Sequence, residues 1–237
     1  MTPNFTRGPA ATRALMFAAA TLVGAPLAGS GAQAQMLLYE NRLPDGFAYV
    51  RFANTLPDAL TVKPDGFADN VTLGTEGGTR VSAYYTVEKV AGRDLALDLK
   101  AKDTPSHATF QLKPGAFHTV LLGWDGKAQV VTDQAEINQT RARLAFYNAE
   151  PDCTAAGLQL EPSGSAVFSA VAPGSMRGRS VNPIAKAKVK AGCGTKSSVP
   201  IDLGELSAGG QYSIWLMAPA GTPVAFMSEN TMAPYLR

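Results

Sequence analysis

The fold is decided by a short stretch of alternating side chains, Phe47-Ala48-Tyr49-Val50-Arg51-Phe52-Ala53-Asn54. Val50 and Phe52 would point to one face of a strand and Arg51 to the other, because side chains alternate along an extended backbone. This pattern predicts a half-buried strand. Similar runs lie downstream at Thr79–Val87, Asp94–Leu99, Ala108–Leu112, Phe117–Leu122 and Ala128–Thr132.

Turn residues separate these runs, and helix signals are weak. Pro44-Asp45-Gly46, Pro64-Asp65-Gly66 and Lys113-Pro114-Gly115 each combine residues that favour tight turns. No stretch carries a sustained helical period of apolar residues together with helix caps. Short strands at this spacing predict an all-β protein built from immunoglobulin-like β-sandwiches.

A second copy of the first strand indicates two domains. Residues 143–148, Arg143-Leu144-Ala145-Phe146-Tyr147-Asn148, match residues 49–54 in the positions of an apolar residue, a phenylalanine and a final asparagine. Later segments also correspond, with Pro114–Phe117 matched to Gly209–Tyr212. We therefore expect a first sandwich over 35–133, a linker over 134–140 and a second sandwich over 141–237. Chance similarity between two β domains is the alternative.

The composition suits a folded protein without a basic excess. The chain has 237 residues, of which 46% are hydrophobic and 17% are charged, so it is too apolar for a disordered protein. Its formal net charge is +2. Removing Arg7 and Arg13, the only charged residues among the first 34, leaves 19 basic and 19 acidic residues. A neutral chain argues against nucleic acid as a partner.

The N-terminus has the features of a secretory signal peptide over residues 1–34. Two arginines precede an apolar run over residues 14–23, and Ala32-Gln33-Ala34 is a small-x-small cleavage motif. Cleavage between Ala34 and Gln35 would release the mature chain, and we expect a periplasmic location. An uncleaved membrane anchor is the alternative, but the apolar run ends well before the roughly 20 residues that span a bilayer.

Cys153 and Cys193 are the only cysteines of the chain. An even pair in an exported protein predicts a disulfide. Closing a loop of this length would stabilise the fold by roughly 4 kcal/mol in the chain-entropy model. A redox or nucleophilic cysteine is the alternative, but the sequence has no Cys-x-x-Cys pair and no histidine close to either cysteine.

Residue types that carry catalysis are scarce. His107 and His118 are the only histidines, and no Gly-x-Ser-x-Gly motif is present. Ser163 and Ser165 lie in a segment that is typical of a turn. The sequence also lacks a P-loop, a dinucleotide-type glycine motif and histidines at metal-ligand spacing. We therefore expect a protein that is not an enzyme and uses no cofactor or metal.

One segment of the second repeat is rich in cations. Residues 173–198 contain no acid and hold Arg177, Arg179, Lys186, Lys188, Lys190 and Lys196. The three lysines at alternating positions 186, 188 and 190 would project from one face of a strand. That face predicts a docking surface for an anionic polysaccharide or an acidic partner protein. The alternative is a solvated edge strand that its lysines protect from aggregation.

Several of these stretches resemble the alginate biosynthesis protein AlgF family. The resemblance rests on Gly46–Asn54, on Ala142–Asn148 and above all on Arg179-Ser180-Val181-Asn182-Pro183-Ile184, in the same order along the chain. It implies a periplasmic tandem β-sandwich protein that is required for O-acetylation of an exopolysaccharide. The implied partners are SGNH-type O-acetyltransferases and the membrane-bound O-acyltransferase system, which carry the catalytic residues themselves. With this motif, Asn182 joins the expected binding residues.

The polymer and the mode of action stay open at this point. The Cys153–Cys193 pair and a long first repeat depart from the family pattern, so the polymer is alginate or another glycan such as cellulose. We expect a non-catalytic adaptor that bridges acetyltransferases, and the polymer, through the basic segment. The alternatives are a stand-alone carbohydrate-binding module, with Trp124 and Trp215 as stacking residues, a two-domain pilus-type chaperone, and an acetyl-transferring enzyme.

Overall fold

The computed structural model describes residues 46–124, 126–133, 136 and 138–234. Within this part of the chain the regular elements are strands, apart from one 3₁₀ turn, η1 (Gly77–Arg80). None of the helical segments among the described residues has the length and apolar character needed to cross a membrane. The expected signal peptide, with its cleavage between Ala34 and Gln35, lies outside the described residues.

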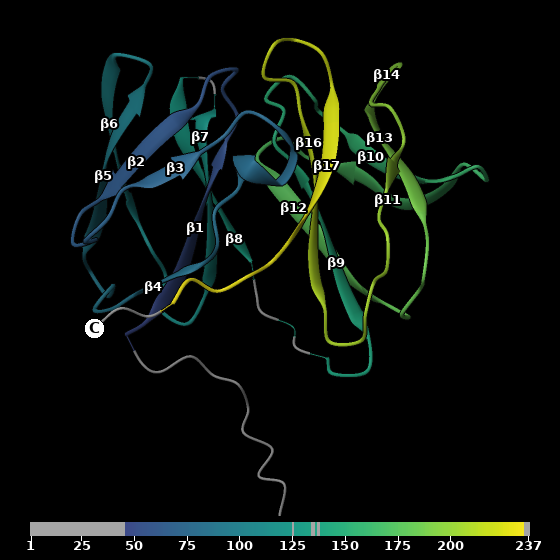
Figure 1. The fold of residues 1–237 in the computed structure, drawn as a ribbon, viewed down its shortest axis with the longest axis horizontal. Helices are drawn as coiled ribbons and strands as arrows, with labels where there is room; N and C mark the ends of the chain where they lie inside the picture. Colours follow the sequence, from purple (N-terminus) through teal and green to yellow (C-terminus); the bar gives the residue numbers. More distant parts are fainter. Residues whose placement is uncertain (1–45, 125, 134–135, 137, 235–237) are drawn as a thin grey trace, which may run out of the picture. The chain divides into compact units, whose positions relative to one another are not determined.

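The first sandwich consists of two four-stranded sheets that enclose a shared core (Figure 1). One sheet has the order β4 (Tyr85–Val87), β1 (Ala48–Asn54), β7 (Phe117–Trp124), β8 (Lys127–Asp133). The other has the order β3 (Val71–Leu73), β2 (Leu60–Pro64), β5 (Asp94–Ala101), β6 (Thr104–Gln111). Val50 and Phe52 of β1 are fully buried in this core, together with Val62 of β2.

The second sandwich repeats this arrangement. One sheet has the order β12 (Ser175–Val181), β9 (Ala142–Asn148), β16 (Gln211–Met217), β17 (Val224–Glu229). The other has the order β11 (Ser165–Val171), β10 (Ala156–Glu161), β13 (Lys188–Cys193), β14 (Lys196–Ser197), and β15 (Ile201–Asp202) also pairs with β13. The predicted all-β sandwich architecture is therefore confirmed. Separate folding of the two predicted domains stays a prediction.

The two sandwiches correspond strand by strand. Their central strands pair in parallel, β1 with β7 and β9 with β16, whereas their neighbours pair antiparallel. Val50 lies beside His118 in the first sandwich, and Leu144 lies beside Tyr212 in the second. The sequence match between Phe117 and Tyr212 is therefore wrong by one residue, because His118 is the counterpart of Tyr212.

Two glycines explain this shift in the match. Gly115 and Gly209 have left-handed φ values of 74° and 77°. Their N–H groups donate to the carbonyl oxygens of Phe47 and Arg141, at 2.8 and 3.0 Å. The two glycines thus start β7 and β16 in the same way. Matching the aromatic residues Phe117 and Tyr212 aligns the two strands one residue out of register, whereas matching the glycine turns aligns them correctly.

The final asparagines of the repeated strand have the same structural role. Asn54 and Asn148 are fully buried at the ends of β1 and β9. The side-chain amide of Asn54 donates to two backbone carbonyl oxygens, at 2.8 and 2.9 Å. The amide of Asn148 donates to the carbonyl oxygens of Cys153 and Val171, at 2.7 and 3.0 Å. Each asparagine therefore ties its strand to the segments that lead into and out of the opposite sheet.

A third core joins the two sandwiches. It lies between the outer faces of the sheets that contain β1 and β9, and its buried members are Ala53, Leu121, Val131, Ala145, Tyr147, Ala149, Trp215, Met217 and Phe226. Strands β1 and β9 are consequently buried on both faces. The prediction of a half-buried first strand is wrong, because the second face of β1 packs against the other sandwich and not against water.

Arg51 lies in this junction and is 1% exposed. Its guanidinium donates to Thr119 Oγ1 of the first sandwich at 2.9 Å, and to Ser213 Oγ and Asn230 Oδ1 of the second at 2.9 and 2.7 Å. The guanidinium carbon lies 4.5, 5.1 and 4.8 Å from the ring centroids of Tyr84, Tyr147 and Trp215. Hydrogen bonds and ring faces thus replace the water that this cation loses on burial.

The run predicted as a strand over Thr79–Val87 is divided in the structure. The turn η1 comes first, and β4 begins only at Tyr85. Arg80 at the end of η1 is buried, and its guanidinium donates to the carbonyl oxygens of Asn54 and Leu56 at 3.1 and 2.8 Å. These contacts hold the chain in a turn, which the alternation of residue types does not reveal.

Candidate functional site

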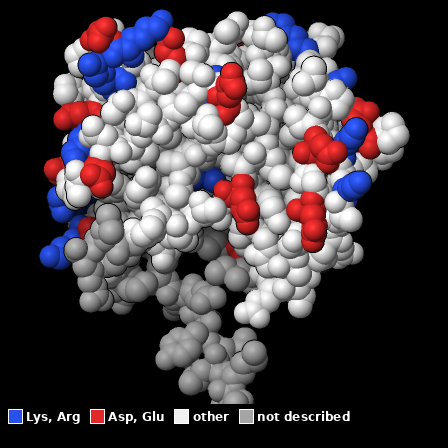
Figure 2. Space-filling view, viewed as in Figure 1, with Lys and Arg blue, Asp and Glu red and all other residues white. Residues whose placement is uncertain are grey.

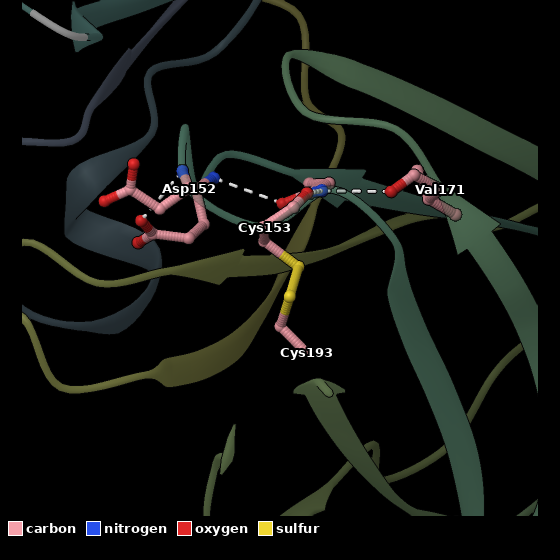
Figure 3. Close-up of a disulfide and its surroundings, with 6 residues drawn as sticks. Asp152, Cys153, Val171 and Cys193 are labelled. Carbon is pink, nitrogen blue, oxygen red and sulfur yellow. Dashed lines mark hydrogen bonds between the residues drawn. A yellow bond between two sulfur atoms is a disulfide. The ribbon is translucent and has the colours of Figure 1, made fainter. Parts of the chain in front are cut away.

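The disulfide predicted between Cys153 and Cys193 is present (Figure 3). The two Cα atoms are 5.7 Å apart, and Cys153 is 1% exposed in the core of the second sandwich. The bond joins the turn after β9 to the end of β13. A dashed line in Figure 3 marks the hydrogen bond that the side-chain amide of Asn148 donates to the Val171 carbonyl oxygen at the end of β11. The disulfide and the hydrogen bond fix the ends of β13 and β11. Both strands belong to the sheet of β11, β10, β13 and β14, which we call the outer sheet of the second sandwich.

The three alternating lysines lie in or next to β13. Lys188 and Lys190 belong to the strand, whereas Lys186 precedes it. Ala187 and Val189 between them are buried, so the lysines point outward as the alternation predicts. The alternative of an edge strand is wrong, because β13 pairs with β10 on one side and with β14 and β15 on the other.

The two lysines within β13 have different neighbours. Lys188 lies opposite Glu161 of β10 and Asp202 of β15. Lys190 lies opposite Gln159 of β10. Opposite residues on neighbouring strands have Cβ atoms about 5 Å apart, so their charges interact. Two acids therefore flank Lys188 in the sheet, although residues 173–198 contain none, and Lys190 is the better candidate for an anionic ligand.

Arg177 and Arg179 lie on β12, in the other sheet of the same sandwich. Their guanidinium groups donate to the carbonyl oxygens of Ser169 and Val167 on β11, at 3.2 and 3.4 Å. The two arginines thus span the gap between the edge strands of the two sheets. Asn182 is exposed in the segment that follows β12. The predicted binding residues therefore occupy two surfaces, an edge of the sandwich and its outer sheet.

An open groove of about 400 Å³ lies over the outer sheet of the second sandwich. Its lining contains Lys190 and Lys196 and no acidic residue. Four uncharged polar residues also line it: Gln159, Ser169, Thr195 and Ser197. The carbonyl oxygen of Ser169 accepts from Arg177, so this arginine lies beside the groove. The groove can therefore offer cations and hydrogen-bond donors to an anionic ligand.

Residues without large side chains make this groove. An ideal Cβ at Gly192 would lie 2.9 Å from the carbonyl oxygen of Lys196, so glycine is needed where β13 and β14 approach each other. Gly157 of β10 lies directly opposite Gly192. Ala170 of β11 has a left-handed φ of 53°, next to an irregularity in the pairing with β10 that is typical of a β-bulge. All three positions line the groove.

Sequence reasoning found part of this groove. It placed Lys190 among the binding residues and Lys196 in the cationic segment, but it missed Gln159 and Gly157. Both missed residues lie on β10, and their position beside β13 depends on strand pairing. The run Gly192-Cys193-Gly194 was the available signal, because closely spaced glycines indicate a close approach of the backbone.

The histidines and the turn serines are each engaged locally. His107 Nδ1 lies 2.7 Å from Asp98 Oδ1 on the exposed β5–β6 hairpin. His118 is fully buried, and its ring lies within hydrogen-bond distance of the Lys113 backbone and of Thr132 Oγ1. Burial lowers the pKa of His118 below its usual value of 6.5. Ser163 Oγ lies within hydrogen-bond distance of the Leu160 carbonyl oxygen and of Ser165 Oγ.

Neither a metal-binding cluster among the described residues nor a continuous basic surface on the face drawn in Figure 2 is found. Among the described residues, no group of three or more His, Cys, Asp or Glu side chains is placed to hold a metal ion. Figure 2 shows one face on which basic and acidic side chains are interspersed between large uncharged areas. Such a mixture differs from the continuous basic surface that nucleic-acid-binding proteins present.

Comparisons with known proteins give only distant structural neighbours. No family model matches the chain, and no curated protein matches it either. A proposed cell adhesion protein from Bacteroides ovatus ATCC 8483 is 8% identical, with a TM-score of 0.24, over 81% of this chain and 100% of the other. A second proposed cell adhesion protein, from Bacteroides fragilis NCTC 9343, is 10% identical, with a TM-score of 0.23, over 92% and 94% of the two chains.

Proposed function

We propose that this protein is a non-catalytic periplasmic adaptor for O-acetylation of an anionic exopolysaccharide such as alginate. It holds a segment of the polymer in the groove over the outer sheet of the second sandwich. Acetyltransferases of the SGNH type, together with the membrane-bound acyltransferase system, carry out the chemistry. The proposal is supported by the resemblance in the sequence and by one observation, the groove lined by Lys190 and Lys196 without any acid.

The groove has the chemistry that a chain of uronic acids requires. Carboxylates along such a polymer are attracted by the ammonium groups of Lys190 and Lys196, and this attraction is strongest where no acid competes. Gln159, Thr195 and Ser197 supply donors and acceptors for sugar hydroxyls. Its open form suits a long polymer, which has to pass along the surface and cannot be enclosed.

Binding without catalysis is sufficient for an adaptor. A polymer segment held beside an acetyltransferase meets that enzyme at a high effective concentration. The third core joins both sandwiches through buried side chains such as Trp215 and Tyr147. A partner bound to one sandwich and a polymer bound to the other would therefore be kept near each other.

Charge reversal in the groove tests the proposal. We expect Lys190→Glu with Lys196→Glu to weaken binding of a fluorescent oligouronate by roughly tenfold or more, because charged hydrogen bonds are lost and repulsion is introduced. Lys127→Glu, compared with Lys190→Glu alone, is the control, since each reverses one lysine and Lys127 lies on the exposed β7–β8 turn of the first sandwich. Fluorescence anisotropy measures binding, and circular dichroism checks that each variant is folded.

The same variants can be tested for polymer acetylation in cells. We expect the groove variant to lower the acetyl content of the exopolysaccharide and the Lys127→Glu variant to leave it unchanged. Lys188→Glu is a poor choice for this purpose, because it would place a third acid between Glu161 and Asp202. Unchanged oligouronate binding by the folded groove variant would contradict the proposed role of this site.

A stand-alone carbohydrate-binding module is less well supported. Trp215, one of the two predicted stacking residues, is fully buried and stacks on Tyr147 at 4.3 Å between ring centroids. Its indole N–H donates to Ser228 Oγ. Trp124 is partly buried against the third core. Trp215 is therefore a core residue and cannot stack on a sugar ring.

A further inference from the structure

The gap between the edge strands is closed in the second sandwich. Arg177 and Arg179 on β12 reach across it and donate to carbonyl oxygens of Ser169 and Val167 on β11. Guanidinium groups thus satisfy backbone acceptors that would otherwise face solvent along β11. The internal repeat makes it possible to ask what occupies the same gap in the first sandwich.

The corresponding gap of the first sandwich is an open cleft of about 600 Å³. It lies between the segment that leads into β3 and the segment that contains β4. In the order of the sheets, β3 and β4 take the places of the edge strands β11 and β12. Tyr85 lies opposite Val50 on β1, just as Arg179 lies opposite Leu144 on β9. Tyr85 therefore has the position that an arginine has in the second sandwich, and it leaves the gap unfilled.

The cleft combines an aromatic wall with an acidic rim. Phe67 and Tyr85 are both partly exposed, and their ring centroids are 5.3 Å apart. The charged residues of the lining are four acids and two bases: Asp65, Asp69, Glu88, Asp94, Lys89 and Arg93. An aromatic surface with excess negative charge around it favours a cation, which gains from both the ring faces and the carboxylates.

The wall of the cleft is held in place by contacts of its own. Lys63 on β2 donates through its ammonium group to the carbonyl oxygens of Phe67 and Ala68, at 2.8 and 2.7 Å. On the opposite side, residues of the C-terminal segment pair with Tyr84, and Pro234 then lines the cleft. A site that is formed before a ligand arrives costs less to occupy.

We propose that this cleft binds an arginine-bearing extended segment of a partner protein. An arginine of the partner enters the gap beside Tyr85, which has the position of Arg179 in the second sandwich. Its guanidinium lies against Phe67 and Tyr85 and donates to the carboxylates of the rim, Asp69 and Asp94. The cleft and the polymer groove are separate sites, so this proposal does not depend on the proposed function.

The chain itself supplies the probe for a direct test. A fluorescein-labelled peptide with the β12 sequence, Ser175-Met176-Arg177-Gly178-Arg179-Ser180-Val181, is titrated with the mature protein and followed by anisotropy. The control peptide has glutamine in place of both arginines. We expect saturable binding of the arginine peptide, and binding of the glutamine peptide that is weaker by roughly tenfold or more, because charge-assisted hydrogen bonds are lost.

Matched protein variants locate the binding site. Asp69→Asn with Asp94→Asn removes two charges from the cleft, and Asp152→Asn with Asp202→Asn removes two exposed charges elsewhere. We expect only the first variant to weaken peptide binding, by roughly tenfold, while oligouronate binding by the groove is unchanged. Equal binding of the two peptides, equal effects of the two variants, or preferential capture of a neutral oligosaccharide by the cleft would each overturn the proposal.

Discussion

The two sandwiches share a framework and differ in what fills it. Both have a central parallel pair of strands that ends in a buried asparagine, Asn54 or Asn148. In the second sandwich, Arg177 and Arg179 span the gap between edge strands. In the first sandwich the same gap is an acidic cleft. The difference shows that buried repeated positions specify the topology, whereas edge positions determine which charge each sandwich presents.

Opposite charge also distinguishes the two cavities. The groove of the second sandwich is lined by Lys190 and Lys196 without an acid, whereas acids outnumber bases in the cleft of the first. Electrostatic complementarity governs which partner approaches a surface more than how tightly it is finally held. An anionic polymer and a basic protein segment would therefore be directed to different sandwiches and would not compete.

We expect the largest loss of unfolding free energy at Arg51, a position in the junction where the two repeats differ. Arg51 of β1 corresponds to Ala145 of β9, and only the arginine carries a charge into the third core. We expect Arg51→Ala to lower the free energy of unfolding by about 3–5 kcal/mol, because it leaves a cavity and removes the partner of buried polar groups. Urea denaturation followed by tryptophan fluorescence measures the loss.

An exposed arginine provides the control for this variant. Arg93 pairs with Asp65 at 3.5 Å, and both side chains are more than half exposed. We expect Arg93→Ala to change the unfolding free energy by less than about 1 kcal/mol, because exposed ion pairs contribute little. Similar losses for Arg51→Ala and Arg93→Ala would mean that the junction does not depend on the buried cation.

At the asparagines that both repeats share, we expect smaller losses of unfolding free energy that are equal in the two sandwiches. Asn54→Ala and Asn148→Ala each remove two hydrogen bonds to backbone carbonyls, which are part-buried for Asn54 and buried for Asn148. We expect each variant to lose about 2–3 kcal/mol, at roughly 1 kcal/mol for each hydrogen bond and more for the carbonyls left unsatisfied. Denaturation of the two variants under identical conditions tests the equivalence. A large loss for one variant and none for the other would show that the shared geometry is not a shared energetic role.

The repeated strand illustrates how much of the fold the sequence predicts. Alternation and the shared final asparagine correctly indicated two similar β-sandwiches, because those features report local geometry and burial. They did not indicate that Arg51 is buried, since a charged residue in an alternating run normally faces water. The packing of one sandwich on the other depends on contacts between distant segments, and the local alternation of residue types does not predict it.

The candidate site shows a similar limit. The acid-free segment drew attention to Lys190, which lines the groove, but it gave no indication that Glu161 and Asp202 lie on either side of Lys188. The cleft beside Tyr85 was missed altogether, because it is formed by the absence of arginines that the other repeat has. Charge in space depends on strand pairing, and pairing partners are distant in the sequence.

The smallest expected effect concerns a pair of corresponding residues, His118 and Tyr212. Each reaches back to the backbone five positions earlier, His118 to Lys113 and Tyr212 to Ser207. Burial lowers the pKa of His118 below 6.5, so the unfolded chain takes up a proton at a higher pH than the folded protein does. Stability should therefore fall as the pH drops from about 6.5 toward the lower pKa of the folded state.

Replacing this imidazole should remove that part of the pH dependence. We expect His118→Gln to be less stable than the parent chain above pH 6.5, because the fitted ring is lost, but to lose less further stability between pH 6.5 and 5. Denaturation midpoints measured across this range give the two slopes. His107 is exposed beside Asp98 and is present in both proteins, so the comparison isolates the replacement at position 118. Parallel slopes would mean that His118 takes up its proton equally in the folded and unfolded states, and that burial in the first sandwich does not disfavour its charge.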